Sequence, residues 1–415
     1  MDVPGLPARR AALSLLDAVL RRGETLDQAA HGALRRVRGE ADKALARAIA
    51  SEVLRWKVDL DGLIDSATKK PLPQDAKPRQ VLGLMLAQWL RLDTPPHAVI
   101  ATGLPLLAGG PRRLAHGVFS TLVKREVALP AAPTLPDAAR LRWGERANAI
   151  AAGLAMPPPL DVTLRNAGET AQWAERLGGL SLMQGHVRLP RGTAVADLPG
   201  YTEGAWWVQD LAASLPARLL GPGEGHRVLD LCAAPGGKTL QLAAAGWQVT
   251  ALDVSKRRLE RLRENLARTS LEARIVTANA LQWEPDEQFD AVLLDAPCTA
   301  TGTCRRHPDV LHRIGSGQIE EMAGLQAALL DRAAQWLKPG GRLVYAVCSL
   351  EREEGEERVA RVPLEPDPIR ADKLPAGLSP SPEGWLRTDP GMLGEQGGLD
   401  GFFIARFVRN PVGNS

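Results

Sequence analysis

A short apolar run leads into a glycine-rich turn at Val228-Leu-Asp-Leu-Cys-Ala-Ala-Pro-Gly-Gly-Lys-Thr239. The run has the composition of a buried strand, and a helix is expected to begin near Thr239. Glycines let a ligand approach the backbone closely, and a helix N-terminus favours negative charge. The spacing matches neither the phosphate-binding loop of nucleotide hydrolases nor the dinucleotide fingerprint. The segment therefore indicates a cofactor loop, with a purely structural tight turn as the alternative.

From about Trp206 onward, apolar runs of strand length alternate with helical patterns. The expected strands are Arg227–Leu231, Gln248–Asp253, Ala273–Ala278, Ala291–Asp295, Arg342–Val347 and Gly401–Val408. A long helix is expected over Ile319–Leu337, ended by Lys338-Pro-Gly-Gly341, and the proline-rich residues 363–395 are expected to form a surface loop. This alternation predicts a doubly wound α/β sheet.

Two cysteines follow strand-like segments directly: Cys298 in Asp295-Ala-Pro-Cys298 and Cys348 in Tyr345-Ala-Val-Cys348. In an open parallel sheet, ligands bind beyond the carboxyl ends of the strands. Both thiols and the glycine-rich turn are therefore expected to converge on one crevice. Inert packing is the simpler interpretation of any single free cysteine, including Cys232 and Cys304. Two thiols at the edge of one crevice favour covalent catalysis.

An acidic residue, Asp253, ends the second expected strand. A carboxylate about 20 positions after a glycine-rich turn can accept hydrogen bonds from ribose hydroxyls. Capping of the next helix is its alternative role, and the two are compatible. An adenine would then rest near Asn279-Ala280, at the end of the third expected strand. If the cofactor with this adenosine moiety is S-adenosylmethionine, its methyl group is electrophilic.

Such a pair of thiols suits methylation of a pyrimidine. A thiolate that adds at C6 makes C5 nucleophilic enough to attack the methyl group, and a second group must then help to remove the C5 proton and release the enzyme. Asp295 can bond the pyrimidine edge and stabilise charge at N3, and the target base must leave its stack to enter the site. Cys298, Cys304 and His307 lack the spacing of a zinc site, so no metal is expected.

Charge is unevenly distributed along the 415 residues, although the net charge is only +3. Residues 1–140 hold 21 basic and 14 acidic residues, which gives +7, and the remainder carries −4. A basic front segment favours binding to a polyanion, with an ordinary solvated helical surface as the alternative. We expect three domains: a helical, polyanion-binding domain over 1–130, which the resemblance described below makes an RNA-binding domain, a small α+β subdomain over 137–205 and a catalytic domain over 206–412.

The front segment has the periodicity of helices. A capping box is expected at Thr25–Gln28 and a helix over Arg79–Leu92. Three prolines within Leu129–Pro136 indicate a linker. In the middle segment, Leu160–Arg165 and Val187–Leu189 are the expected strands.

Four cysteines in a chain of this length do not form a disulfide framework, which predicts reduced thiols and a cytoplasmic setting. The apolar segment Leu13–Leu20 is interrupted by Ser14 and Asp17, so no signal segment is expected. Uncharged apolar stretches stay well short of the roughly 18 residues that span a bilayer, so no membrane partner is expected.

Together, these motifs resemble those of the Nol/Nop/Sun family of RNA 5-methylcytidine methyltransferases. They are most similar to the Sun-type bacterial enzymes, which methylate 16S ribosomal RNA and carry a NusB-like helical domain. The motifs that carry the resemblance are Val208-Gln-Asp210, Val228–Thr239, Asp295-Ala-Pro-Cys298 with Thr301-Gly302, Arg305-Arg-His-Pro-Asp309, Lys338-Pro-Gly-Gly341 and Tyr345-Ala-Val-Cys-Ser349. The match covers nearly the whole chain.

The resemblance implies an all-α NusB-like domain, a small α+β subdomain and a Rossmann-like domain that binds S-adenosylmethionine. It implies that Cys348 is the nucleophile, that Cys298 helps to release the product and that Asp295 borders both base and cofactor. The implied cofactor residues are Cys232, Ala233, Ala234, Pro235, Gly236, Gly237, Lys238, Asp253, Asn279 and Asp295. Two positions depart from the family pattern: Asn279 replaces the usual Asp, and Val347 replaces the usual Thr.

The expected activity is thus methylation of cytosine C5 in RNA, with 16S ribosomal RNA as the favoured substrate. Transfer RNA stays open as an alternative substrate. A DNA cytosine methyltransferase would attack with the Pro-Cys thiol, and the presence of Cys348 argues against it. A non-catalytic RNA-binding assembly factor is the alternative from another class, and the retention of both thiols argues against that.

Overall fold

The computed structural model describes residues 4–192 and 194–411. The chain folds into two compact units: unit 1 comprises Met1–Met156 and Cys304–Ile314, and unit 2 comprises Pro157–Thr303 and Gly315–Ser415. This division differs from the three expected domains. The proline-rich segment expected as a linker lies within unit 1. Of the middle subdomain expected over 137–205, residues 137–156 belong to unit 1, and the part from Pro157 onward belongs to unit 2 together with the catalytic part.

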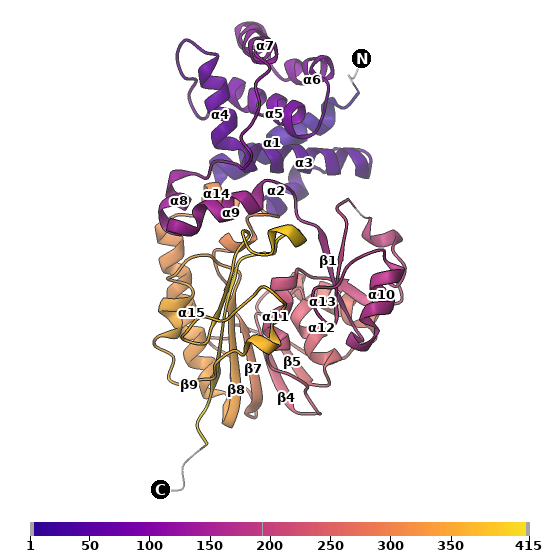
Figure 1. Ribbon diagram of the computed structural model, residues 1–415, viewed down its shortest axis with the longest axis vertical. Coiled ribbons are helices and arrows are strands. Elements are labelled where there is room, and N and C mark those ends of the chain that lie inside the picture. Colours follow the sequence, from indigo (N-terminus) through magenta and orange to yellow (C-terminus); the bar gives the residue numbers. More distant parts are fainter. Residues whose placement is uncertain (1–3, 193, 412–415) are drawn as a thin grey trace. The chain divides into compact units, whose positions relative to one another are not determined.

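Unit 1 is helical, as the sequence predicts (Figure 1). Its principal helices are α1 (Leu6–Arg22), α2 (Leu26–Ala33), α3 (Glu40–Arg55), α4 (Lys57–Ser66), α5 (Lys77–Arg91), α6 (Pro96–Gly103), α7 (Gly109–Lys124), α8 (Asp137–Trp143) and α9 (Ala147–Leu154). Apolar side chains such as Leu16, Ile49 and Phe119 are fully buried in one core. The capping box is confirmed: Thr25 and Gln28 exchange backbone-to-side-chain hydrogen bonds of 3.0 and 3.1 Å.

A segment from the second half of the sequence completes unit 1. It contains α14 (Val310–Arg313), which packs against α1 and α3 and is drawn in orange in Figure 1. Arg55 of α3 donates a hydrogen bond of 2.9 Å to the carbonyl of Arg305, and His312 Nε2 lies 2.6 Å from the carbonyl of Leu54. Burial lowers the pKa of His312, so the neutral ring donates this bond. The chain therefore leaves unit 2 after Thr303 and returns to it at Gly315.

Unit 2 is built on a mixed sheet with strand order β10-β11-β8-β7-β4-β5-β6, in which β9 also pairs with β11. The parallel strands are β4 (Arg227–Leu231), β5 (Gln248–Asp253), β6 (Arg274–Thr277), β7 (Phe289–Asp295) and β8 (Leu337–Val347). The antiparallel strands are β9 (Glu365–Pro366), β10 (Leu386–Thr388) and β11 (Phe402–Val408). The doubly wound α/β fold expected from the sequence is confirmed.

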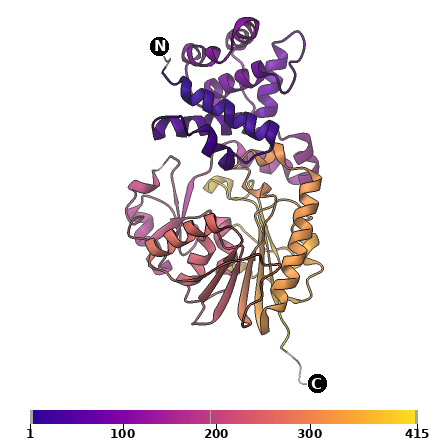
Figure 2. The same cartoon turned by 180° about the vertical axis from the view of Figure 1, so that it is seen from behind.

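Helices cover both faces of this sheet. They are α11 (Leu211–Arg218), α12 (Gly237–Ala244), α13 (Lys256–Thr269) and α15 (Ser316–Gln335), followed by the short α16 (Glu356–Val359). Successive strand residues point to opposite faces, so Leu293 packs in the core that includes α11, whereas Leu294 packs in the core that includes α15. Figure 2 shows the helices between residues 237 and 269 in front of the parallel strands. Burial on both faces explains why these strands are continuous apolar runs.

Two local expectations were wrong. The long helix ends at Gln335, and Lys338–Gly341 lies within β8 rather than terminating a helix. Hydrogen bonds from Gly340 N to Arg409 O and from Arg409 N to Gly341 O hold this segment in extended pairing. Residues 363–395 are more than a surface loop: they contain β9 and β10, and Ile369 and Leu378 are buried against the sheet.

A second, smaller sheet has the order β2-β1-β3 and is antiparallel. Its strands are β1 (Leu160–Leu164), β2 (His186–Leu189) and β3 (Trp206–Val208), and α10 (Thr170–Arg176) packs beside β2. Both strands expected in the middle segment are present. Val162, Val187 and Trp206 are fully buried and form its core with Trp173.

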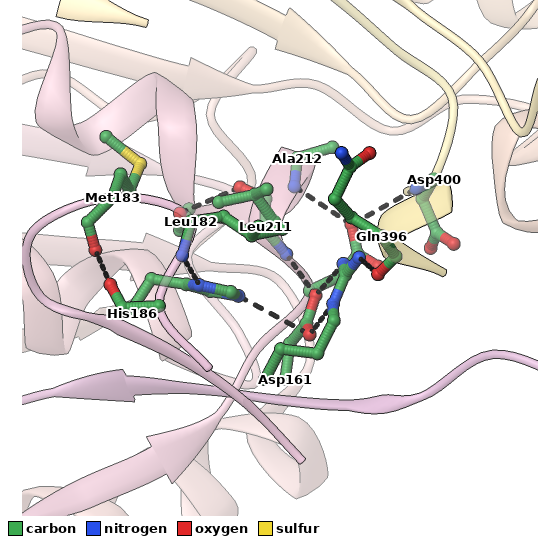
Figure 3. Close-up of polar contacts among 12 residues, drawn as sticks. Asp161, Leu182, Met183, His186, Leu211, Ala212, Gln396 and Asp400 are labelled. Atoms are coloured by element: carbon green, nitrogen blue, oxygen red, sulfur yellow. Dashed lines mark hydrogen bonds and ion pairs between the residues drawn. The ribbon is translucent and has the colours of Figure 1, made fainter. Parts of the chain in front are cut away.

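A buried ionic cluster joins this small sheet to the rest of unit 2 (Figure 3). Arg188 donates two hydrogen bonds of 2.7 Å to the two carboxylate oxygens of Asp161, and a third of 2.7 Å to the carbonyl of Gln396. The Leu211 N–H, at the start of α11, donates to Asp161 at 3.0 Å, and His186 Nε2 lies 3.4 Å from it. Burial alone would raise the pKa of Asp161, but Arg188 and His186 outweigh it and lower the pKa.

Asp161→Ala should therefore destabilise the folded protein by about 3–5 kcal/mol, because it leaves the Arg188 guanidinium buried without its counter-charge. Chemical unfolding of the full chain, followed by circular dichroism, measures this loss. The matched control is Asp137→Ala, since the Asp137–Arg140 pair is exposed and should contribute at most about 1 kcal/mol.

The pH dependence has a defined sign. A carboxyl whose pKa is lowered by folding contributes stability above its unfolded pKa and loses it as the pH falls through the folded pKa. The difference in the free energy of unfolding between wild type and Asp161→Ala should therefore have its full value at neutral pH and become smaller in strong acid. If the Asp161 and Asp137 variants lost the same free energy of unfolding, the proposed contribution of the buried cluster to stability would be contradicted.

Candidate active site

The chain reverses its direction of winding at β4. From β4 it builds outward through β5 and β6 on one side, and then returns to add β7 and β8 on the other side. Ligands of open α/β sheets bind at such a switch point, beyond the carboxyl ends of the strands. The strands β4, β7 and β8 end at Leu231, Asp295 and Val347, immediately before the glycine-rich turn, the Pro-Cys segment and Cys348. The three segments singled out by the sequence thus meet at one edge of the sheet.

The two thiols lie side by side. Cys298 Sγ and Cys348 Sγ are 3.5 Å apart, and both side chains are partly buried. The hydrogen bond with Cys348, together with burial, raises the pKa of the Cys298 thiol well above its ordinary value. At neutral pH Cys298 is therefore a protonated donor next to the Cys348 sulfur.

A close backbone approach sets the position of the Cys348 loop. Gly302 N donates to the Cys348 carbonyl at 3.0 Å, and Gly401 N donates to the Gly302 carbonyl at 2.8 Å. A Cβ at position 302 would lie 2.0 Å from the Gly401 carbonyl oxygen, so only glycine fits there. This explains physically why Thr301-Gly302 accompanies the Pro-Cys motif.

A buried carboxylate braces the two thiol-bearing loops against each other. Glu354 accepts hydrogen bonds from Thr299 N at 2.9 Å and from Gln326 Nε2 at 3.0 Å. The hydroxyls of Thr299 and Ser349, which directly follow the two cysteines, also donate to it. Sequence reasoning missed Glu354, whose only signal was its place in the acidic run after the second thiol. Glu354 thus connects the loop of Cys298 to the loop of Cys348, so the positions of the two sulfur atoms depend on each other.

An ion pair lies beside the thiols. Lys238 Nζ donates to Asp295 Oδ2 at 2.7 Å, with the two side chains 11% and 30% exposed. Burial acts to lower the pKa of Lys238, but the charge of Asp295 and its hydrogen bond outweigh burial, and the pKa is raised. Lys238 was expected simply as a member of the cofactor loop. In the structure it reaches back to Asp295, and it stays protonated there.

The glycine-rich turn has the backbone that its sequence suggests. Gly236 has a φ of 111°, and a Cβ there would lie 2.3 Å from Leu262 Cδ1. Cys232 adopts a left-handed φ of 61°, and burial raises the pKa of its thiol to about 12, so this thiol is unreactive at neutral pH. The remaining loop residues, Ala233, Ala234, Pro235 and Gly237, lead into α12.

Asp253 is buried at the end of β5 and holds this turn in place. Its carboxylate accepts from Ala234 N at 3.2 Å, from Ser255 N at 2.8 Å and from Arg258 Nη2 at 2.5 Å. The bond from Ser255 N ties Asp253 to the start of α13. Because the Arg258 side chain is 49% exposed, a ribose hydroxyl could replace it on the carboxylate.

The end of β6 offers a further donor. Asn279 is exposed, and its Oδ1 accepts from Leu281 N at 3.0 Å, which leaves the Nδ2 amide without a partner among the described residues. An adenosine group fits three features of this edge of the sheet. They are the Asn279 amide donor, the Asp253 carboxylate at the end of β5, and the turn at Gly236, where there is no room for a side chain. These residues are thus able to hold S-adenosylmethionine.

Beneath the turn lies a second carboxyl that sequence reasoning did not select. Asp230 of β4 is fully buried and accepts from the Thr239 hydroxyl of α12 at 2.5 Å. Burial raises its pKa to about 7. The bond fixes the first turn of α12 on the strand that precedes the cofactor loop.

Within residues 4–192 and 194–411, no three or more His, Cys, Asp or Glu side chains are grouped so that they could hold a metal ion. Cys304 and His307 belong to unit 1, whereas Cys298 belongs to unit 2. Across the same described ranges, the helices lack the combination of length and apolar character that a membrane crossing requires.

Comparison with known proteins supports the resemblance. Residues 217–408 match the family described as 16S rRNA methyltransferase RsmB/F, and residues 6–106 match the NusB family. Ribosomal RNA small subunit methyltransferase B of Xylella fastidiosa is 36% identical, over 98% of this chain and 99% of its own. The protein of the same name from Xanthomonas campestris is 33% identical, over 98% of each chain.

Among solved structures, PH0851 is 22% identical with a TM-score of 0.72, and the match covers 99% of this chain and 100% of that one. It shares the fold along the whole chain. The multidomain architecture implied by the resemblance, with a NusB-type helical part before a Rossmann-like methyltransferase part, is confirmed. From its similarity to full-length relatives, the chain belongs to the RsmB/F family of 16S rRNA methyltransferases.

Proposed function

We propose that this protein transfers the methyl group of S-adenosylmethionine to C5 of a cytosine in RNA, and that the RNA is 16S ribosomal RNA. The observation that carries the proposal is the pair of thiols 3.5 Å apart at the switch point, next to the glycine-rich turn. Membership of the RsmB/F family and the names of the relatives support a ribosomal RNA substrate. The net positive charge of residues 1–140 suits contacts with RNA phosphates.

In the first step, the Cys348 thiolate adds to C6 of a flipped-out cytosine, and the electrons of the C5–C6 double bond become available at C5. Asp295 accepts a hydrogen bond from the polar edge of the base. Lys238, held protonated by Asp295, places a positive charge against the negative charge that builds up on the ring. Both side chains are already oriented by their mutual bond before the base arrives.

The cofactor, when bound, supplies an electrophilic methyl group to C5. The residues that would hold it are the turn Cys232–Lys238, Asp253 at the ribose and Asn279 near the adenine. Asp230 acts indirectly, since its bond to Thr239 positions α12 behind the turn.

In the last step, a solvent water molecule takes the C5 proton, the electrons of the C5–H bond re-form the C5–C6 double bond, and the Cys348–C6 bond breaks. The Cys348 sulfur departs as a thiolate. Cys298 lies 3.5 Å from that sulfur and keeps its own proton, so it can donate a hydrogen bond to the departing thiolate. We assign this stabilising role in product release to Cys298.

Incubation of the full chain with S-adenosylmethionine labelled in its methyl group tests the proposal. Transcripts of 16S ribosomal RNA and of transfer RNAs are treated in parallel, digested to nucleosides and separated by chromatography. Label is expected in 5-methylcytidine from the 16S transcript. Label confined to transfer RNA would favour the alternative substrate. Cofactor binding without label in any RNA would favour a non-catalytic assembly factor.

A further inference from the structure

A hollow of about 680 Å³ lies at the amino ends of the strands of unit 2. Its wall includes Asp290 at the start of β7, Lys338–Arg342 at the start of β8, and His226 and Trp247 just before β4 and β5. Cys298 and Cys348 lie beyond the carboxyl ends of the same strands. The hollow is therefore at the opposite edge of the sheet from the active site, and the proposed reaction does not use it.

Basic side chains dominate this hollow. The wall includes six, namely Arg218, Lys338, Arg342, Arg370, Lys373 and Arg406, against Glu224 and Asp290 as its acidic members. Three of the six form ion pairs, with Asp290, Asp367 and Asp372. Arg342 and Lys373 are exposed, and their side chains have no hydrogen-bond or ion-pair partner among the described residues.

Arg218 adds a further uncompensated charge. Its guanidinium donates to the carbonyls of Gln184 at 2.7 Å and Gly185 at 2.9 Å, and to the Ser214 hydroxyl at 3.3 Å, which are all neutral acceptors. Burial lowers its pKa to about 10, which still leaves it charged at neutral pH. One cation held by neutral acceptors and two exposed cations in the same lining make a site for an anion with several charges.

A second hollow of about 680 Å³ adjoins the first, since Arg218, Gly221 and Pro222 line both. The second hollow extends toward Arg165 and Asn166. Trp247, fixed by a 3.0 Å hydrogen bond from its Nε1 to the Gly221 carbonyl, forms an aromatic part of the wall. These two adjoining hollows, called the groove below, combine cations with an aromatic ring, and these are the features that bind single-stranded nucleic acid.

We propose that this groove, lined by Arg218, Arg342, Lys373 and Trp247, binds the phosphodiester backbone of the RNA at a distance from the reacting base. The inference rests on the proposed RNA substrate. Arg342 lies near the start of β8 and Cys348 directly after its end, six residues further on. Along an extended strand this corresponds to about 20 Å. Only an RNA that reaches over several nucleotides can occupy both sites. An acidic protein segment is the competing ligand, and the aromatic wall favours RNA over it.

The test compares two double variants of the full chain. Arg342→Gln with Lys373→Gln removes both free cations of the groove, and Arg263→Gln with Arg361→Gln removes two exposed charges outside its lining. The Kd for a 16S transcript is measured over a range of KCl concentrations. The groove variant should bind about tenfold more weakly than the control, and its slope of log Kd against log salt should fall by about 1.5.

Equal Kd values and salt slopes for the two double variants would overturn the inference. Loss of binding to a poly-glutamate peptide with unchanged RNA binding would also overturn it, in favour of an acidic protein partner. Methyl transfer by the wild type on the same transcript is measured in parallel. If methyl transfer is absent while the groove variant still shows its weaker, less salt-dependent binding, the proposed reaction fails and the groove assignment stands.

Discussion

Cys348→Ala should abolish methyl transfer to RNA, with a fall in rate on the order of 10⁴-fold, the scale on which loss of a nucleophile acts in other enzymes. Without the thiolate there is no addition at C6, and C5 of an unmodified cytosine is too weak a nucleophile to attack the methyl group. The measurement is incorporation of labelled methyl groups into RNA under single-turnover conditions.

Binding of S-adenosylmethionine should be unchanged in this variant, because Cys348 lies beyond β8 and outside the glycine-rich turn. Isothermal titration calorimetry checks this and shows that the cofactor site is intact. Cys304→Ala is the control for removal of a thiol, since Cys304 is buried in unit 1 and has no place in the proposed reaction. Full methyl transfer by Cys348→Ala would refute the assignment of the nucleophile.

Cys298→Ala should accumulate a covalent protein–RNA adduct. Cys348 can still add to C6 in this variant. Its departing thiolate, however, has lost the Cys298 thiol, the donor that lies 3.5 Å away in the wild type. Turnover should fall by about 10²- to 10³-fold, the range for loss of one hydrogen-bond donor to a developing anion. The adduct is measured as a band of reduced mobility on a denaturing gel that disappears after ribonuclease treatment.

Two further variants separate the roles of the thiols. Cys298→Ser retains a hydroxyl donor and should release RNA faster than Cys298→Ala. The double variant Cys298→Ala with Cys348→Ala should form no adduct, because the attacking sulfur is gone. An adduct that persists in the double variant would show that another group attacks the base.

The location of the candidate site could be predicted from sequence because its signals are local. Apolar runs such as Ala291–Leu294 mark buried strands, and the residue that follows each run must lie at a strand end. The parallel arrangement then brings Cys298, Cys348 and the glycine-rich turn to one edge. The spacing of motifs was specific enough to indicate the family.

The partners of the site residues could not be predicted in the same way. Lys238 and Asp295 are 57 positions apart, and Thr299 and Glu354 are 55 apart, so no periodicity links them. The sequence marks Lys238 as part of a loop, but only packing shows that it reaches back to Asp295. Glu354 looks like any acidic residue in a polar run until its burial is known.

The sequence by itself determined the helical and α/β parts, the strand ends and the two thiols, because these depend on hydrophobic periodicity and on short motifs. Tertiary structure alone decided that residues 304–314 complete unit 1 and that the amino ends of the strands form a basic groove. The physical reason is that segment exchange, buried ion pairs and surface hollows arise from contacts between residues remote in the chain. Their free energy depends on burial and on distance, which no local pattern records.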